Sequence, residues 1–182
     1  MREDRPAYVP FDPISKAGLI DACCHILGNT CRIARIALSY QWNVAGPGAL
    51  QAEASFRDQS EELHGALAPI AEHIRSLGGA AILDYSDDTV MADIPTPSDL
   101  PDLLEMFQVM VDCHREACIS IEAAIDIAEE AADRPGIRLL TDRLAAHRRH
   151  AWRAQMSEGD APVQVAMTEQ RQTLRITRAQ QD

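Results

Sequence analysis

Apolar residues recur at the spacing of an amphipathic helix in four segments of the chain. The pattern predicts helices over residues 15–41, 49–77, 98–132 and 137–155. The rhythm of the first segment is carried by these apolar positions: Leu19, Ile20, Cys23, Ile26, Leu27, Ile33, Ile36 and Ala37. No set of segments alternates apolar and polar residues as strands require. The chain is therefore expected to be all-α.

Turn-forming residues separate these segments and set the order of the helices. Residues 43–48 join the first two helices, Gly78 and Gly79 end the second, and residues 133–136 separate the last two. Residues 80–97 are mixed in character and punctuated by proline, and their length suits a crossover better than a tight hairpin. These features predict a four-helix bundle with a long crossover between its second and third helices.

The length and the pattern together indicate one domain with two tails. A chain of 182 residues fits one domain and is long enough to bury a core. We expect an N-terminal tail over residues 1–14, the bundle over residues 15–156 and a C-terminal tail over residues 157–182. The last segment is polar and has only a weak apolar rhythm, so it either packs on a neighbouring molecule or stays disordered.

Composition narrows the range of functions. The chain has 17 basic and 28 acidic residues and a net charge of -11, and neither tail supplies a basic excess that would offset phosphate repulsion, so DNA binding is a weak hypothesis. Five cysteines lie within helical patterns, which favours buried, reduced thiols over disulfides. No apolar run approaches the roughly 20 residues that cross a bilayer, and the start resembles no secretory leader. A soluble, cytoplasmic protein is expected.

Four short motifs carry a resemblance to a known family. They are the turn at residues 42–47 (WNVAGP), residues 70–79 (IAEHIRSLGG), residues 124–131 (AIDIAEEA) and residues 147–152 (HRRHAW). In this order and spacing they resemble the Dps miniferritins over residues 17–155. The resemblance implies the ferritin-like four-helix bundle and a hollow shell of twelve identical subunits built from two-fold dimers. It also implies storage of oxidised iron, and in some members of the family DNA binding.

The family's iron-oxidising centre lies across the two-fold dimer interface, and its ligand positions fall on altered residues here. The resemblance places these positions at Gln41, Glu53, Arg57, Ala68 and Glu72. Only Glu72 matches the family's ligand, although Glu53 also offers a carboxylate. Arg57 is a permanent cation and Ala68 has no donor. A degenerate centre is therefore predicted, with Glu53 and Glu72 as its remaining metal ligands, and ferroxidase activity is not expected.

The same positions form part of a stripe on the second helix. Glu53, Arg57, Glu61, His64 and Glu72 share one face at about 100° per residue. One hypothesis is that Arg57 takes the place of the metal charge, so that the carboxylates form a salt-bridged dimer contact. The alternative is an ordinary solvated charged stripe. Pro69, inside this helix, is also expected to kink it close to Glu72.

Other metal-binding combinations have a simpler interpretation as core or surface residues. Glu61 and His64 have the Glu-x-x-His spacing of di-iron bundles, but the fourth helix lacks the second copy that such a site requires. His114, His147 and His150 are able to meet inside the bundle, where hydrogen-bonded core histidines are more common than ligands. Met106, Met110 and His114 form a core stripe at i,i+4 steps rather than a haem contact.

A last site follows from the resemblance alone. The family lines three-fold pores with acidic residues near the junction of the third and fourth helices. The matching positions are Asp133 and Asp142, with Arg138 where another acid would be unsurprising. The alternative is that these charges simply solvate the helix ends.

Three functional classes remain from the sequence. The first is a Dps-like cage that binds and sequesters iron on interior carboxylates and protects against stress, with a degraded ferroxidase site and iron as its only cofactor or cargo. The second is a structural or partner-binding shell that no longer handles iron. The third, a DNA-compacting protein, is disfavoured by the net charge of -11.

Overall fold

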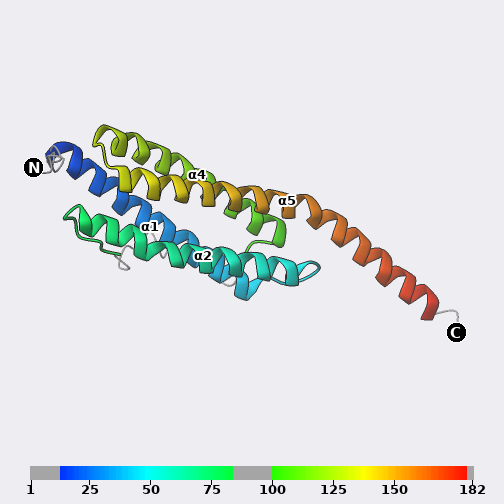
Figure 1. Ribbon diagram of the computed structural model, residues 1–182. Coiled ribbons are helices and arrows are strands. Elements are labelled where there is room, and N and C mark those ends of the chain that lie inside the picture. Colours follow the sequence, from blue (N-terminus) through cyan, green and yellow to red (C-terminus); the bar gives the residue numbers. More distant parts are fainter. Residues whose placement is uncertain (1–12, 84–99, 180–182) are drawn as a thin grey trace, which may run out of the picture.

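The computed structural model describes the backbone of residues 13–83 and 100–179 and the side chains of residues 16–83 and 100–156. In these ranges the chain forms helices and no strand, which confirms the all-α prediction. The helices are α1 (Pro13–Asn43), α2 (Ala49–Ser76), α4 (Leu103–Glu130) and α5 (Arg134–Ala179). They pack side by side as a four-helix bundle (Figure 1). No helix in the described ranges is long and apolar enough to cross a membrane.

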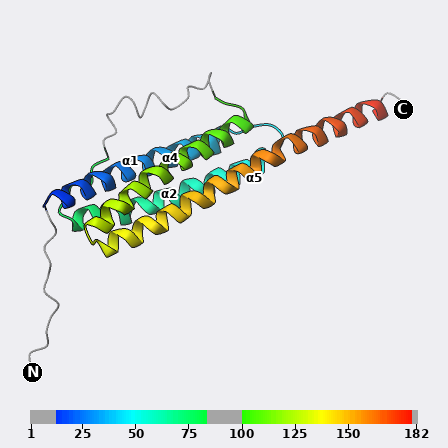
Figure 2. The ribbon, with the colours of Figure 1, turned by 90° about the horizontal axis from the view of Figure 1, so that it is seen from above.

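The order of the helices explains the long crossover. α1 pairs with α2, and α4 pairs with α5, each pair antiparallel, while α1 also packs against α4 (Figures 1 and 2). As a result α2 and α4 run in the same direction. The connection between them must therefore span the length of the bundle, about 40 Å for a helix of 28 residues. Residues 84–99 of that connection lie outside the described residues.

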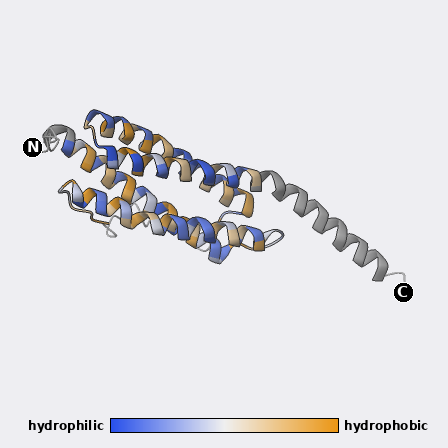
Figure 3. Ribbon diagram, viewed as in Figure 1, coloured by the Kyte–Doolittle hydropathy of each residue, from blue (hydrophilic) through white to orange (hydrophobic). Residues whose placement is uncertain are grey.

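Two apolar clusters form the core, one toward each end of the bundle. One is built around Tyr40, Phe56 and Phe107, whose ring centroids are 5.6 Å apart for Tyr40–Phe56 and 5.0 Å apart for Phe56–Phe107. The other is built from aliphatic residues such as Ile70 and Leu140. Figure 3 shows that hydrophobic and hydrophilic residues alternate along each helix of the bundle, as amphipathic helices require. Polar side chains between the two clusters form the site described below.

The third helix begins later than its sequence pattern predicted. It starts at Leu103, and residues 100–102 are not helical. The side chain of Asp102 caps it by accepting a hydrogen bond from the backbone N–H of Glu105 at 2.9 Å. Ser98, where the helix was predicted to start, lies outside the described residues. Ser98 and Asp102 are both residue types that cap helices, and the apolar periodicity does not show which of them does so. The hydrogen bond from Glu105 identifies Asp102 as the cap.

The fourth helix is longer than predicted at both ends. α5 starts at Arg134, because Pro135 falls in the first helical turn, where its missing N–H costs no hydrogen bond. It then continues past residue 155, where the predicted helix ended, to Ala179, and this extension projects beyond the bundle (Figures 1 and 2). Ala154 is the last residue of α5 in the described core. The division into bundle and tail at residue 156 stays a prediction.

The cysteines are free thiols, as the sequence indicated. Cys23, Cys31 and Cys113 are buried, and Cys24 and Cys118 are half-buried. Burial raises the pKa of the Cys23 thiol to about 12, and the nearby Asp133 carboxylate adds to the shift. Cys23 therefore stays protonated and packs as a small apolar residue.

The turn between α4 and α5 is joined to the end of α2 by a buried contact. The His73 Nε2 and Asp133 Oδ2 atoms lie 2.8 Å apart, with exposed side-chain fractions of 8% and 4%, at an angle that makes no hydrogen bond. Gly136 faces this contact. A Cβ atom on Gly136 would lie 2.1 Å from Asp133 Oδ2 and 2.8 Å from His73 Nε2, closer than any real contact. Glycine is thus required there by space.

Gly136→Ala is expected to lower the free energy of unfolding by about 1 to 3 kcal/mol, because the new methyl group must displace the packed His73 and Asp133 side chains. Gly65→Ala is the matched control. Gly65 lies inside α2, and a Cβ atom there meets nothing within 4 Å. That variant is expected to be more stable than the natural chain by about 0.5 to 1 kcal/mol. Chemical denaturation followed by circular dichroism measures the free energy of unfolding of both variants. Equal effects of the two substitutions would contradict the crowding at Gly136.

Candidate metal centre

The residues at the family's iron positions line the outside of the subunit. On α2, Arg57, Ala68 and Glu72 are exposed, and Glu53 is partly exposed. Gln41 is half-buried near the end of α1. Arg57 donates a hydrogen bond to the Glu53 carboxylate, the i,i+4 ion pair that the sequence indicated. The structure thus pairs the candidate ligand Glu53 with a permanent cation.

The two candidate carboxylates do not meet within one subunit. Glu53 and Glu72 are separated by 19 residues of continuous helix, or about 28 Å along α2. A metal ion held by both would require a second copy of the chain. Pro69 lies between them inside α2, which continues through it as one helix. The assignment of Glu53 and Glu72 as ligands stays a prediction.

A different set of polar groups meets in the middle of the bundle, and an ion pair stands at its centre. Arg143 of α5 donates two hydrogen bonds to Glu62 of α2, from Nη1 to Oε1 at 2.5 Å and from Nη2 to Oε2 at 3.0 Å. His150 Nε2 lies 3.2 Å from the same Oε2 atom. The Arg143 and His150 side chains are 9% and 7% exposed, and that of Glu62 is 35% exposed. Both oxygens of Glu62 are therefore occupied.

Beside this ion pair, a chain of hydrogen bonds fixes the tautomers of two histidines. The Gln59 amide N–H₂ donates to the Ser55 carbonyl at 3.3 Å, which leaves its carbonyl oxygen facing His114 Nε2 at 3.0 Å. His114 must then donate from Nε2, so its Nδ1 accepts the hydrogen bond from His147 Nδ1 at 2.9 Å. The chain ends at His147 Nε2, a lone pair without a hydrogen-bond partner among the described residues.

Burial and charge set the protonation of this cluster. Burial is the main cause that lowers the pKa of His114 to about 2 and that of His147 to about 4, and the positive charge of Arg143 acts in the same direction on both. Burial alone would raise the pKa of Glu62, but the hydrogen bonds from His150 and Arg143 outweigh it and hold that pKa well below its usual range. At neutral pH the cluster therefore holds an ionised Glu62–Arg143 pair and two neutral imidazoles.

The histidines predicted to meet inside the bundle do so, but their main partners were missed. Sequence reasoning weighed Glu61 and His64, yet both are exposed, and His64 Nδ1 lies 2.8 Å from the Ser60 carbonyl of its own helix. Glu62, one position later, faces the cluster instead. Among the side chains that the structure describes, no group of three His, Cys, Asp or Glu is arranged to hold a metal ion.

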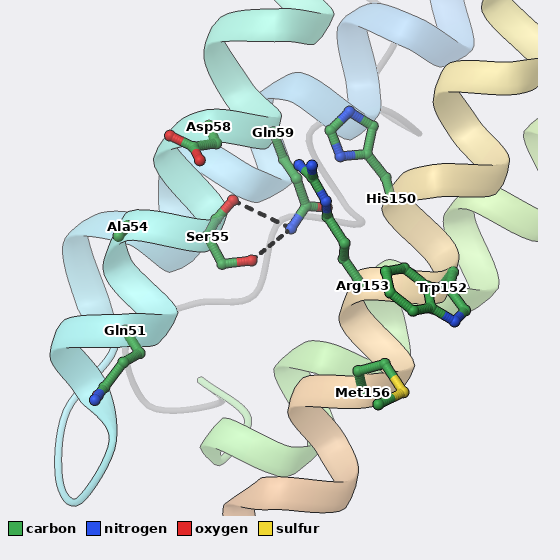
Figure 4. Close-up of a pocket in the computed structure, with 9 residues that line it drawn as sticks. All are labelled: Gln51, Ala54, Ser55, Asp58, Gln59, His150, Trp152, Arg153 and Met156. Carbon is green, nitrogen blue, oxygen red and sulfur yellow. Dashed lines mark hydrogen bonds between the residues drawn. The ribbon is translucent and has the colours of Figure 1, made fainter.

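A pocket connects the histidine cluster to the surface. It lies between α2 and α5, has a volume of about 510 Å³, and is lined by Gln51, Ala54, Ser55, Asp58, Gln59, His150, Trp152, Arg153 and Met156. Figure 4 shows Gln59 and His150 at its inner end, with Trp152 and Met156 at the outer part of the α5 wall. Gln59 and His150 therefore belong both to the pocket and to the buried network.

The two acids predicted to line a pore have different environments. Asp133 is 4% exposed and contacts His73, whereas Asp142 and Arg138 are exposed on α5. Within the subunit, Asp133 thus serves the contact at the α4–α5 turn. Whether either acid borders a pore depends on the assembly, so the pore stays a prediction.

The fold agrees with comparisons to known proteins. Residues 24–157 match the ferritin-like domain family, so the chain belongs to the ferritin-like family. Within that family it is a Dps miniferritin, as the sequence motifs indicated. The DNA protection during starvation protein of Brevibacillus brevis is 25% identical over 114 residues, which cover 63% of this chain and 76% of that protein.

Solved structures share the same fold. The DPS protein of Vibrio cholerae, described as a member of a broad superfamily of ferritin-like diiron-carboxylate proteins, superposes with a TM-score of 0.71 at 19% identity, covering 82% of this chain and 94% of that one. A dodecameric thioferritin of Bacteroides fragilis superposes with a TM-score of 0.72 at 19% identity, covering 85% and 90%. At this level of identity the likeness concerns the fold.

Proposed function

We propose that this chain assembles into a cytoplasmic shell that takes up iron as cargo and protects against stress, without the family's intersubunit iron-oxidising centre. Membership of the ferritin-like family supports iron handling in general. The description of the Bacteroides fragilis relative as dodecameric supports twelve subunits, built here from two-fold dimers. Exposed carboxylates on α2, such as Glu61 and Glu72, supply oxygen ligands for a growing mineral.

The Arg57–Glu53 ion pair is the observation that supports a degraded oxidation centre. A ferrous ion at this position would meet a guanidinium that cannot lose its proton. Gln41 offers an amide in place of a stronger donor, and Ala68 offers none. Oxidation of iron needs several carboxylates to stabilise the higher charge, and this set has too few.

Ferrous iron titration in air tests both parts of the proposal. We expect iron to be oxidised no faster than in a protein-free blank, because the oxidation centre is degraded, and yet to remain soluble and to co-elute with the protein. A rapid oxidation phase that saturates at a fixed number of ions per subunit would contradict the degraded centre. Iron that precipitates as it does in the blank would contradict storage.

The second candidate is a structural or partner-binding shell that does not handle iron. The engagement of Glu53 by Arg57 and of Glu62 by Arg143 favours it, since both remove carboxylates from metal binding. Failure of iron to co-elute, together with a closed shell, would select this candidate. The shell itself requires a solution mass about twelve times that of the 20.0 kDa chain, and a dimer would contradict it.

DNA binding is disfavoured by the net charge of -11. We expect no gel shift of duplex DNA even at low salt, where phosphate contacts are strongest. A shift that disappears as salt is added would instead support a DNA-binding role.

A further inference from the structure

The pocket between α2 and α5 lies where two neighbouring helices pack less closely than the other neighbouring pairs do. α2 packs against α1 and α5 packs against α4, whereas α2 and α5 approach each other at few places. The Glu62–Arg143 ion pair bridges part of the remaining space. The pocket has a volume of about 510 Å³, and pockets of roughly 300 to 1,000 Å³ hold small molecules in other proteins. It is therefore large enough for a ligand.

At the inner end of the pocket, His150 has a ring nitrogen without a hydrogen-bond partner. Its Nε2 lies 3.2 Å from the Glu62 carboxylate, which only accepts, so Nε2 is the donor and Nδ1 of the neutral ring is an acceptor. None of the described residues donates to this Nδ1, although His150 is only 6% exposed. Glu62 is not among the lining residues, so the pocket borders the edge of the ring that faces away from Nε2 (Figure 4). A ligand with an O–H group would supply the missing donor.

The outer part of the pocket has an apolar wall that the fold leaves uncovered. Trp152 and Met156 are one helical turn apart on α5, and their side chains are 60% and 55% exposed. Both line the pocket. An indole ring offers a large flat surface on which another aromatic ring stacks, and a thioether also packs well against such a ring. This wall therefore favours a flat, apolar ligand.

The charges around the pocket favour a ligand without net charge. Asp58 of α2 and Arg153 of α5 both line it and have opposite signs. Behind its inner end, the charge of Glu62 is balanced by Arg143. An ionic ligand would lose its hydration there without meeting an excess of the opposite charge. A neutral molecule does not have this cost.

We propose that the pocket between α2 and α5 binds a small neutral aromatic alcohol, whose ring packs on Trp152 and Met156 and whose hydroxyl group donates a hydrogen bond to His150 Nδ1. A phenol-type molecule combines the flat ring and the single donor in one rigid unit. It would satisfy a buried acceptor and cover an exposed indole at the same time. The inference concerns one subunit and does not depend on iron storage by the shell.

2-Naphthol is the probe, because it is neutral at pH 7 and joins a flat ring system to one hydroxyl group. 2-Methoxynaphthalene is the matched probe, since a methyl group replaces the hydrogen that would be donated. Equilibrium dialysis of the full-length protein against each compound is expected to show one bound 2-naphthol per subunit. Its affinity should be about tenfold higher than that of 2-methoxynaphthalene, the effect of one hydrogen bond to a buried acceptor.

Three variants locate the bound ring. His150→Gln keeps an amide N–H that reaches Glu62 but has no acceptor in place of Nδ1. It should lower the affinity for 2-naphthol about tenfold and leave that for 2-methoxynaphthalene unchanged. Trp152→Ala should lower the affinity for both compounds by about tenfold, because both rings lose their stacking surface. Trp42→Ala is the control: it removes an indole that is 71% exposed outside the pocket, and it should change neither affinity.

Three results would overturn the proposal. One is equal affinity of the natural chain for the two compounds, a comparison that does not depend on the folding of any variant. Another is binding that Trp152→Ala leaves undiminished. The third is the absence of binding of either compound. In that case, protection of Trp152 from acrylamide quenching in the ligand-free Trp42→Phe variant would show that a second copy of the chain covers the apolar wall.

Discussion

Arg143→Ala is expected to lower the free energy of unfolding by about 2 to 3 kcal/mol. The substitution leaves the Glu62 carboxylate without both of its guanidinium hydrogen bonds. Breaking a fully buried ion pair costs about 3 to 5 kcal/mol, because one charge is left uncompensated. The expected value is smaller here, because Glu62 keeps 35% of its side chain exposed and water screens part of the lost interaction.

Arg148→Ala is the matched control for this prediction. Arg148 also lies on α5 and donates to a glutamate of another helix, Glu122 of α4, at 2.5 Å. Its side chain is 63% exposed and that of Glu122 is 50% exposed, so the loss should stay below about 1 kcal/mol. Urea denaturation of both variants at neutral pH provides the comparison. Similar losses would mean that burial of Arg143 adds nothing to the strength of its ion pair.

The helices themselves were predictable, because their cores have simple periodicity. α1 and α2 were predicted to within a few residues, since Pro13, the turn at residues 43–48 and the glycines at 78 and 79 are strong local signals. The ends of α4 and α5 were less certain from sequence. Asp102 and Ser98 are both good caps, and Gly159 lowers the stability of a helix without ending it.

The buried network was only partly predictable from sequence. The three histidines were placed inside the bundle, but Glu62 and Arg143 were not identified, since a charged residue at a core position is normally a deviation from the helical pattern. The position of Glu62 on its helix is the signal that could have identified it. The buried face of α2 is formed by Phe56, Gln59, Leu63 and Ala66, and Glu62 lies at the edge of that face. Arg143 precedes His147 by one helical turn. Which charge pairs with which depends on contacts between helices, and no single helix encodes these.

For the exposed stripe on α2, in contrast, the sequence predicted the contact between side chains but not its role. The Glu53–Arg57 pair followed directly from i,i+4 spacing and is present in the structure. Its proposed role at a dimer interface depends on a second subunit, which one chain cannot define. Local spacing therefore predicted the contact and left its function to the assembly.

Lowering the pH from 7 to 4.5 is expected to destabilise the subunit through its buried histidines. The pKa of an unfolded histidine is about 6.5, whereas it is about 2 for His114 and about 4 for His147 in the folded chain. Because the folded values are depressed, these residues contribute no pH-dependent loss above pH 6.5, and stability falls as the pH drops below it. By pH 4.5 each contributes a loss on the order of 2 to 3 kcal/mol, at 1.36 kcal/mol per pKa unit.

Replacing both His114 and His147 with glutamine is expected to flatten this pH dependence, because a glutamine side chain does not take up a proton between pH 7 and 4.5. The stability at neutral pH is compared separately and does not enter this test. The remaining polar groups of the cluster, Glu62, Arg143 and His150, are common to both proteins. The lowered pKa of Glu62 adds its own loss only at more acidic pH, below the ordinary value of about 4.5. Urea denaturation at several pH values measures both curves, and parallel curves would show that the two imidazoles do not cause the acid sensitivity.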